Sequence, residues 1–211
     1  MNKKTTGENA LEMFCKQHNI VFEKIIEDDY EKPDYKLTFE KTFSIIAEVK
    51  DLENNIIEKQ AIIEYDQKGF AVWDVSKPGY RIKNKIEDAK KQLEYSEMVK
   101  LPSVLLLFDN RKDITKGIYE YEISTGMYGI ESRNITENKI EIRHGSYKKL
   151  TDNQFTFITY VGYLNNNQLI FYENYYGKRK LNRTMLKNNG ICIKYGNNPE
   201  KEVVKWKEQD I

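Results

Sequence analysis

Apolar residues near the start of the chain recur at helical spacing. Between Glu8 and Cys15 they return every three to four positions, which indicates a helix with one buried face that Thr5 or Thr6 can cap. The helix is expected to end near His18, and a short strand is expected over Ile20–Ile26.

From residue 35 onward the spacing is that of strands. Tyr35, Leu37 and Phe39 alternate with polar residues, which is typical of a half-buried strand. The run Phe43–Val49 is more continuously apolar, as in a central strand covered on both faces. Together with the strand at residues 20–26, these segments predict an antiparallel meander.

The pattern is less regular between residues 51 and 81. Glu64–Gly69 has the character of a turn or loop, Phe70–Val75 that of a short strand, and Pro78-Gly79 breaks any regular element. Amphipathic spacing then predicts one helix over Ile82–Met98, followed by a buried strand over Val104–Phe108. The predicted order is helix, three strands, helix and strand.

Beyond residue 110 the clearest feature is a predicted β-hairpin. Phe155–Tyr163 and Gln168–Tyr172 flank three consecutive asparagines, which favour a tight turn. We therefore predict an α/β protein with a core over residues 1–125, in which helices flank a mixed sheet. A β-rich extension over residues 126–211 is expected to pack on that core within one structural domain.

The composition fits a folded chain and limits the kinds of site it can hold. Of 211 residues, 39% are hydrophobic, which is enough for a substantial core. No apolar run reaches about 18 residues and the N-terminus lacks a secretory signal, so a cytoplasmic protein is expected. Cys15 and Cys192 lie far apart among apolar residues, as buried thiols do. Because His18 and His144 are too few for a histidine-rich zinc site, a hydrolytic metal would need carboxylate ligands.

The net charge of +1 gives no overall attraction to nucleic acid, so any such binding must come from local clusters. Six basic residues lie between Lys77 and Lys91, and a second group lies between Lys178 and Lys187. Either group is equally compatible with an ordinary solvated face, because 32% of the chain is charged.

Glu48 and Lys50 suggest chemistry because they end an apolar run, where an ionised side chain is costly unless it is paired or bound to metal. Alternate residues of a strand point to the same face, so the two side chains should lie together. Val49 points the other way and leaves its carbonyl as a hard oxygen ligand. Asp34, at the start of the preceding strand, would add a second carboxylate if the two strands pair.

Two carboxylates, a backbone carbonyl and waters match the oxygen preference of Mg²⁺, with Mn²⁺ as an alternative. Such a metal would acidify a bound water, and the Lys50 ammonium could stabilise the developing negative charge. The set Asp34, Glu48 and Lys50 therefore suits phosphodiester hydrolysis. The structural alternative is that Asp34 is an ordinary turn residue and that Glu48 and Lys50 form an ion pair at a strand end.

Pro33-Asp34, followed after thirteen residues by Glu48-Val49-Lys50, resembles the motif of the PD-(D/E)xK nuclease superfamily. Residues 78–92, 102–110 and 171–174 are similar to uncharacterised bacterial restriction-endonuclease-like proteins, and the likeness covers most of residues 8–110. The resemblance implies a restriction-endonuclease-like αβββαβ core. It assigns Asp34 and Glu48 to metal, Lys50 to catalysis, and Gln92 to supporting the catalytic centre.

The resemblance also implies an acidic residue on the first helix, for which Glu12 is the first candidate and Glu8 the second. Phosphates could dock at the N-terminus of the helix near Ile82, and this side carries the candidate nucleic-acid-binding residues Arg81, Lys83, Lys85 and Lys91, with Lys90 as a possible extension.

The function expected from these residues is a Mg²⁺-dependent nuclease that acts on DNA in preference to RNA. The alternative is a catalytically inactive nucleic-acid-binding or interaction module of a defence or mobile-element system. A small-molecule hydrolase or transferase is less favoured, since the chain has neither a G-x-S-x-G elbow nor a Walker-type loop. Many members of the superfamily dimerise to cut both strands, but no heptad repeat marks a homodimer here.

Overall fold

The computed structural model describes residues 4–26, 31–72, 79–111, 120–136, 139–144, 148–165 and 168–208, with only the backbone for most of 131–143. The helices are α1 (Thr6–Gln17), α2 (Ile56–Lys68), α3 (Tyr80–Asp88), α4 (Lys90–Val99), α5 (Glu120–Tyr128) and α6 (Arg183–Asn188). The strands are β1 (Val21–Lys24), β2 (Tyr35–Phe39), β3 (Phe43–Leu52), β4 (Ser103–Asp109), β5 (Glu131–Thr136), β6 (Lys139–His144), β7 (Ile158–Leu164), β8 (Leu169–Glu173), β9 (Ile191–Tyr195) and β10 (Lys207–Glu208).

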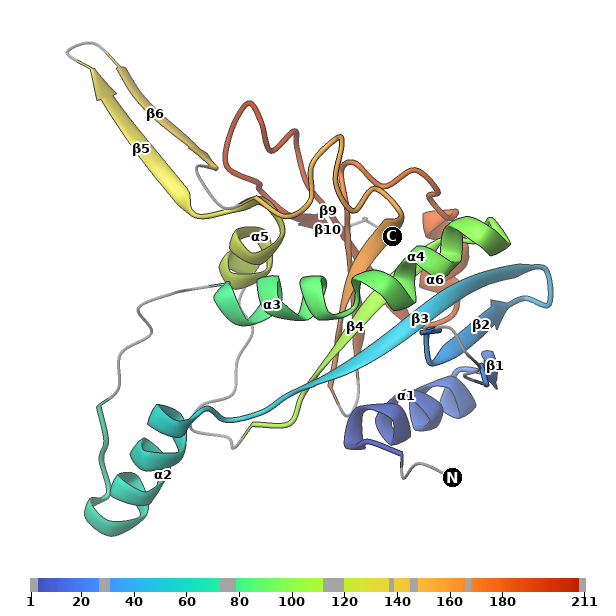
Figure 1. Ribbon diagram of the computed structural model, residues 1–211, viewed down its shortest axis with the longest axis horizontal. Helices are drawn as coiled ribbons and strands as arrows, with labels where there is room; N and C mark the ends of the chain where they lie inside the picture. The colour runs from blue at the N-terminus through green and yellow to red at the C-terminus, as the bar shows by residue number, and fades with distance from the viewer. Residues whose placement is uncertain are drawn as a thin grey trace.

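A mixed sheet with the strand order β1-β2-β3-β4-β7-β8-β9-β10 forms the centre of the α/β fold (Figure 1). The strands β1, β2 and β3 pair antiparallel, which confirms the predicted meander. β3, β4 and β7 run parallel to one another, and β7 pairs antiparallel with β8. The strand β3 therefore lies inside the sheet, between an antiparallel and a parallel neighbour.

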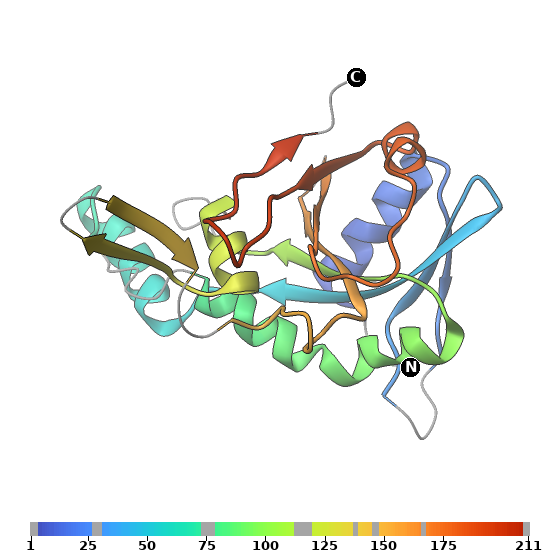
Figure 2. The same ribbon diagram turned by 90° about the horizontal axis from the view of Figure 1, so that it is seen from above.

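Helices cover both faces of this sheet, and each face has its own apolar core (Figures 1 and 2). One core joins residues of α1 and α6 to Ile45, Ala47 and Val49 of β3. The other joins residues of α3, α4 and α5 to Leu105 and Leu107 of β4. Because neighbouring strand residues point to opposite faces, β3 presents Glu48 and Lys50 on the side of α3 and α4.

The first helix begins and ends as its sequence indicates. The Thr5 side chain accepts a hydrogen bond from the Glu8 amide, and the Glu8 carboxylate accepts one from the Thr5 amide, which completes a capping box. Leu11, Phe14 and Cys15 are buried against the sheet. Cys15 and Cys192 are free thiols, and Cys192 is only partly buried.

Within residues 51–81, the prediction of a loop at 64–69 was wrong, whereas the predicted break at Gly79 coincides with a left-handed backbone just before α3. Glu64–Gly69 is not a loop, because residues 64–68 belong to α2 and Gly69 ends that helix in a left-handed conformation. The signal for α2 was present in the sequence, since Asn55 and Glu58 form a second capping box. Residues 70–72 form no strand, and residues 73–75 of the predicted strand lie outside the described residues.

The helix predicted over Ile82–Met98 is two helices, α3 and α4, which meet at Ala89. The buried residues Ile82, Ile86, Ala89 and Leu93 keep the predicted apolar face across this junction. The predicted strand over Val104–Phe108 and the hairpin of β7 and β8 are present, the hairpin with its first strand starting at Ile158.

Two elements project from the body. Helix α2 and the β5–β6 hairpin both extend from the side of the molecule on which α3 begins (Figures 1 and 2). Among the described residues, no helix is long and apolar enough to cross a membrane.

The contact between β4 and β7 can be tested at Gly162, which lies opposite Leu106. A Cβ at Gly162 would lie 2.4 Å from Leu106 Cδ2. We expect Gly162→Ala to reduce the free energy of unfolding by about 1–3 kcal/mol through overpacking, and Leu106→Ala to reduce it by about 2–5 kcal/mol. The loss of unfolding free energy in the double variant should be smaller than the sum of the two single losses by about 1 kcal/mol or more. The reason is that the shortened side chain at residue 106 leaves room for the added methyl group.

Urea denaturation of the four proteins measures this coupling. The matched control pairs Gly162→Ala with Leu105→Ala, because Leu105 is equally buried but belongs to the core on the other face of the sheet. Additive losses in the Gly162 and Leu106 pair would contradict the packing described.

Candidate active site

Asp34 and Glu48 face each other across the seam between β2 and β3. Tyr35 pairs with Ala47 in the antiparallel register, so the preceding residue, Asp34, lies opposite Glu48. The Asp34 amide donates a hydrogen bond to Glu48 Oε2 over 3.2 Å, and the Val49 amide donates one to Asp34 Oδ2 over 2.9 Å. The two carboxylates are therefore held by the backbone of the neighbouring strand.

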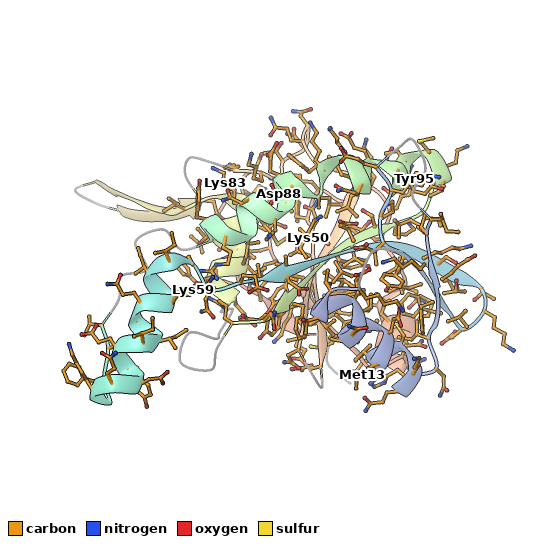
Figure 3. All side chains as sticks on the ribbon, turned by 60° about the horizontal axis from the view of Figure 1, so that its bottom comes forward. Met13, Lys50, Lys59, Lys83, Asp88 and Tyr95 are labelled. Atoms are coloured by element: carbon orange, nitrogen blue, oxygen red, sulfur yellow. The ribbon has the colours of Figure 1, made fainter. Side chains whose placement is uncertain are left out.

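Lys50 completes the cluster from the same strand face as Glu48. Its Nζ lies 2.7 Å from Glu48 Oε1, with 22% of the lysine side chain and 5% of the glutamate side chain exposed. The predicted strand-end ion pair is thus present, and it lies beside Asp34 and not apart from it. Figure 3 shows Lys50 between α1, labelled at Met13, and α3, labelled at Lys83 and Asp88.

The two carboxylates are electrostatically strained. Burial, followed by repulsion from Asp34, raises the pKa of Glu48 to about 7 in spite of the contact with Lys50. Burial also raises the pKa of Asp34, against the hydrogen bond from Val49. Two acids this close either share a proton or attract a cation, and an added positive charge would relieve the repulsion between them.

A second layer of charge links this cluster to helix α1 through Lys24. Its ammonium contacts Glu8 and lies 3.8 Å from Asp34 Oδ1. Glu8 also closes the capping box of α1, so the start of that helix is tied to the site. Lys24 was missed from the sequence because only the pairing of β1 with β2 brings it opposite Tyr35.

Glu12, the first candidate for the acidic residue on the first helix, contacts Tyr35, the neighbour of Asp34. It accepts a hydrogen bond from the Tyr35 hydroxyl over 2.8 Å and pairs with Lys4 at 2.6 Å. Although burial opposes this, these two hydrogen bonds lower the pKa of Glu12. Glu8 is linked to Asp34 by Lys24, which contacts both carboxylates. Glu12 is linked to the site only through Tyr35, the residue that follows Asp34.

Gln92 lies on α4, the helix that packs against β3 on the face of Glu48 and Lys50. Its Oε1 atom is buried, and it has no hydrogen-bond partner among the described residues. A buried carbonyl oxygen without a donor is costly, so this acceptor is open to a donor that the chain itself does not supply. No hydrogen bond joins Gln92 directly to Asp34 or Glu48 in the described part of the chain.

The predicted nucleic-acid-binding residues have different environments. Arg81 lies 2.6 Å from Glu58 Oε1 and donates to the Glu53 carbonyl, so its guanidinium is engaged in holding α2 to α3. Lys91 pairs with Glu31 at 3.1 Å on the surface. Lys83 and Lys85 are partly exposed on α3, beyond the first turn that starts at Tyr80.

Sequence reasoning also missed a buried charge cluster at the ends of β3 and β4. Arg111 donates from Nε and Nη2 to the two carboxylate oxygens of Asp109, over 2.7 and 2.8 Å. Its Nη1 lies 3.7 Å from Glu58, the residue that also binds Arg81. The two-residue spacing of Asp109 and Arg111 gives no signal, because the pairing depends on how the chain turns after β4.

The donor set at Asp34 and Glu48 fits a hard divalent cation. Both residues offer oxygen ligands and face each other, and a bound cation would reduce the repulsion between their negative charges. Among the described residues, no three or more histidine, cysteine, aspartate or glutamate side chains are grouped to hold a metal. Mg²⁺ commonly uses only one or two carboxylates, with waters and substrate phosphates completing its shell. The role of the Val49 carbonyl as a third ligand stays a prediction.

The strain on Glu48 predicts a pH effect on stability. Because its pKa is raised in the folded protein, the folded state binds more protons than the unfolded state between about pH 4.5 and 7, and stability falls as the pH rises through this window. Relative to Glu48→Gln, the wild-type protein should lose on the order of 3 kcal/mol of unfolding free energy between pH 5 and 8.

Chemical denaturation in EDTA at both pH values measures the difference. The matched control is Glu94→Gln, which changes an exposed glutamate of α4 and should follow the wild-type pH dependence. Parallel curves for wild type and Glu48→Gln would show that Glu48 is not strained.

No protein-family model, curated protein or solved structure matches this chain.

Proposed function

We propose that the chain is a Mg²⁺- or Mn²⁺-dependent nuclease that hydrolyses phosphodiester bonds, with DNA as its substrate. The observation that carries the proposal is the convergence of Asp34, Glu48 and Lys50 from two adjacent strands, joined by the contacts of Asp34 with Val49 and of Glu48 with Lys50. The buried Glu48, the partly buried Asp34 and a lysine in contact with Glu48 are groups that metal-assisted phosphodiester hydrolysis can use.

Each residue has a distinct task in this proposal. Asp34 and Glu48 would hold the cation, which when bound would acidify a water and offset charge on the scissile phosphate. The Lys50 ammonium, already beside Glu48, would orient the attacking water and stabilise negative charge that develops on the phosphate. The unpaired Gln92 carbonyl would accept a hydrogen bond from a water in the site.

The order of elements supports a restriction-endonuclease-like core. Helix α1, the strands β1 to β3, the helices α3 and α4, and β4 give the αβββαβ order once α2 is treated as an insertion after β3. Asp34 then precedes the second strand, and Glu48 and Lys50 lie on the third. We propose that this part of the chain is the catalytic core, within a sheet that β7 to β10 extend.

Cleavage assays test the catalytic assignment. We expect cutting of plasmid DNA in Mg²⁺ or Mn²⁺ but not in EDTA, and a loss of at least about 100-fold in rate for Asp34→Asn, Glu48→Gln and Lys50→Ala. Single-stranded DNA and RNA, tested in parallel, decide the substrate class.

The controls are Glu94→Gln and Lys201→Ala, which remove the same charges from exposed positions and should keep full activity. Cutting that survives Glu48→Gln or EDTA would end the catalytic assignment. Binding of nucleic acid without any cutting would instead favour the inactive binding module.

The basic residues of α3 make separate predictions for binding. Measured in the Glu48→Gln background, Lys85→Ala should weaken DNA binding similarly across sequences and reduce the slope of log affinity against log salt by about one. Arg81→Ala should act mainly on stability, by about 1–3 kcal/mol, because it leaves the buried Glu58 with fewer partners.

Fluorescence anisotropy over a salt series and urea denaturation separate the two effects. Lys201→Ala is the control for loss of a surface charge. If Lys85→Ala keeps the wild-type slope of log affinity against log salt, Lys85 does not contact the DNA and α3 is not part of the binding surface.

A further inference from the structure

Helix α2 and the residues that follow it carry apolar side chains that stay exposed in the described part of the structure. Between residues 56 and 72, six large apolar side chains are exposed by 42–86%: Ile56, Ile57, Ile63, Tyr65, Phe70 and Val72. Ile56 and Ile63 share one side of α2, Ile57 and Tyr65 lie on the other side, and Phe70 and Val72 follow the end of the helix.

Part of this surface forms a single stripe along the helix. Ile56, Lys59, Ile63 and Asp66 are spaced three, four and three residues apart, which places them within an arc of about 80°. The buried residues Glu58, Ala61 and Ile62 lie roughly 120°, 180° and 80° around the helix from the centre of this stripe. The stripe therefore faces away from the body, in keeping with the projection of α2 in Figures 1 and 2.

The two charges in the stripe have no partners within the described part of the chain. Lys59 and Asp66 are both exposed, and neither forms an ion pair with any described residue. Seven residues separate them, about 10 Å along the axis, so they cannot pair with each other. Figure 3 labels Lys59 on α2.

We propose that α2 pairs antiparallel with α2 of a second copy of this chain, about a two-fold axis that passes between the two helices, perpendicular to them, at the level between Ile62 and Ile63. Such an axis brings Lys59 opposite Asp66 of the second copy, and the reverse, so each charge gains one partner and the dimer holds two equivalent ion pairs. It also brings the two Ile63 side chains together at the axis. A two-fold interface must be self-complementary, and this stripe is.

Other occupants fit the stripe less well. Residues 56–68 carry three acids, Glu58, Glu64 and Asp66, against two lysines, Lys59 and Lys68, so the helix does not attract phosphates. Helices that lie on membranes carry an excess of lysine and arginine on their polar face, which α2 lacks. The inference rests on α2 alone and does not depend on the proposed nuclease activity.

Charge reversal tests the register of the pair. By sedimentation at micromolar concentration, we expect the wild-type protein to be a dimer. Lys59→Asp and Asp66→Lys should each weaken it at least tenfold, since each places like charges opposite each other. The double variant Lys59→Asp with Asp66→Lys should restore the dimer, because opposite charges again face each other. Ile63→Asp should also give monomers.

The matched control is Met98→Asp, which introduces the same charge at an exposed apolar residue of α4 and should leave the dimer intact. Circular dichroism checks that each variant is folded. A monomeric wild-type protein, a dimer that survives Ile63→Asp, or a double variant without restored association would overturn the proposal. A face that binds a different protein would instead leave the purified wild-type protein monomeric, which is the first of these results. Nuclease activity is measured separately, so its absence would leave this result standing.

Discussion

The antiparallel pairing of β2 with β3 is the interaction on which the candidate site depends. It sets Asp34 opposite Glu48 and lets the Val49 amide hold the Asp34 carboxylate. Side chains alternate between the faces of a strand, so a slip of one residue would move Glu48 to the α1 face and separate the carboxylates. The parallel pairing with β4 and the apolar cores on both faces fix β3 against such a slip.

Two clusters of buried charge in this molecule are built in different ways. Asp109 and Arg111 satisfy each other through a two-point hydrogen-bonded pair, and Glu58 and Arg81 extend the network. At Asp34 and Glu48, two acids face each other with lysines at the edge, and the pKa of Glu48 is raised. The first arrangement joins α2, α3 and the end of β4. In the second, the repulsion between the two carboxylates is not fully offset by the lysines. Strain that the rest of the fold must offset is typical of functional sites.

The C-terminal strands complete the sheet that holds the site. β7 pairs with β4, so β4 is covered on both edges and the three parallel strands lie in the middle of the sheet. The close contact of Gly162 with Leu106 shows how tightly these strands are joined. Helix α2 is the contrasting element, since its apolar stripe lies outside both cores. The candidate site therefore lies on the central sheet, and the proposed contact surface lies on the projecting helix.

The sequence by itself determined the elements whose signals are local. The capped helix α1, the alternation of β2, the apolar run of β3 and the turn between β7 and β8 could all be predicted, because propensity, capping and spacing act within a few residues. The prediction that Glu48 and Lys50 share a face followed from the two-residue period of a strand. Helix α2 was missed because apolar residues on two of its sides hid the helical period, although its capping box was readable.

Only the tertiary structure decided which distant residues meet. The pairing of β2 with β3 brings Asp34 to Glu48, and the pairing of β1 with β2 brings Lys24 to Asp34. The fold also placed Arg81 against Glu58, a contact that the sequence does not predict. These contacts join residues across many positions of the chain, and their energies depend on burial and on neighbouring charges. Burial and neighbouring charge exist only once the strands have paired and the helices have closed over them.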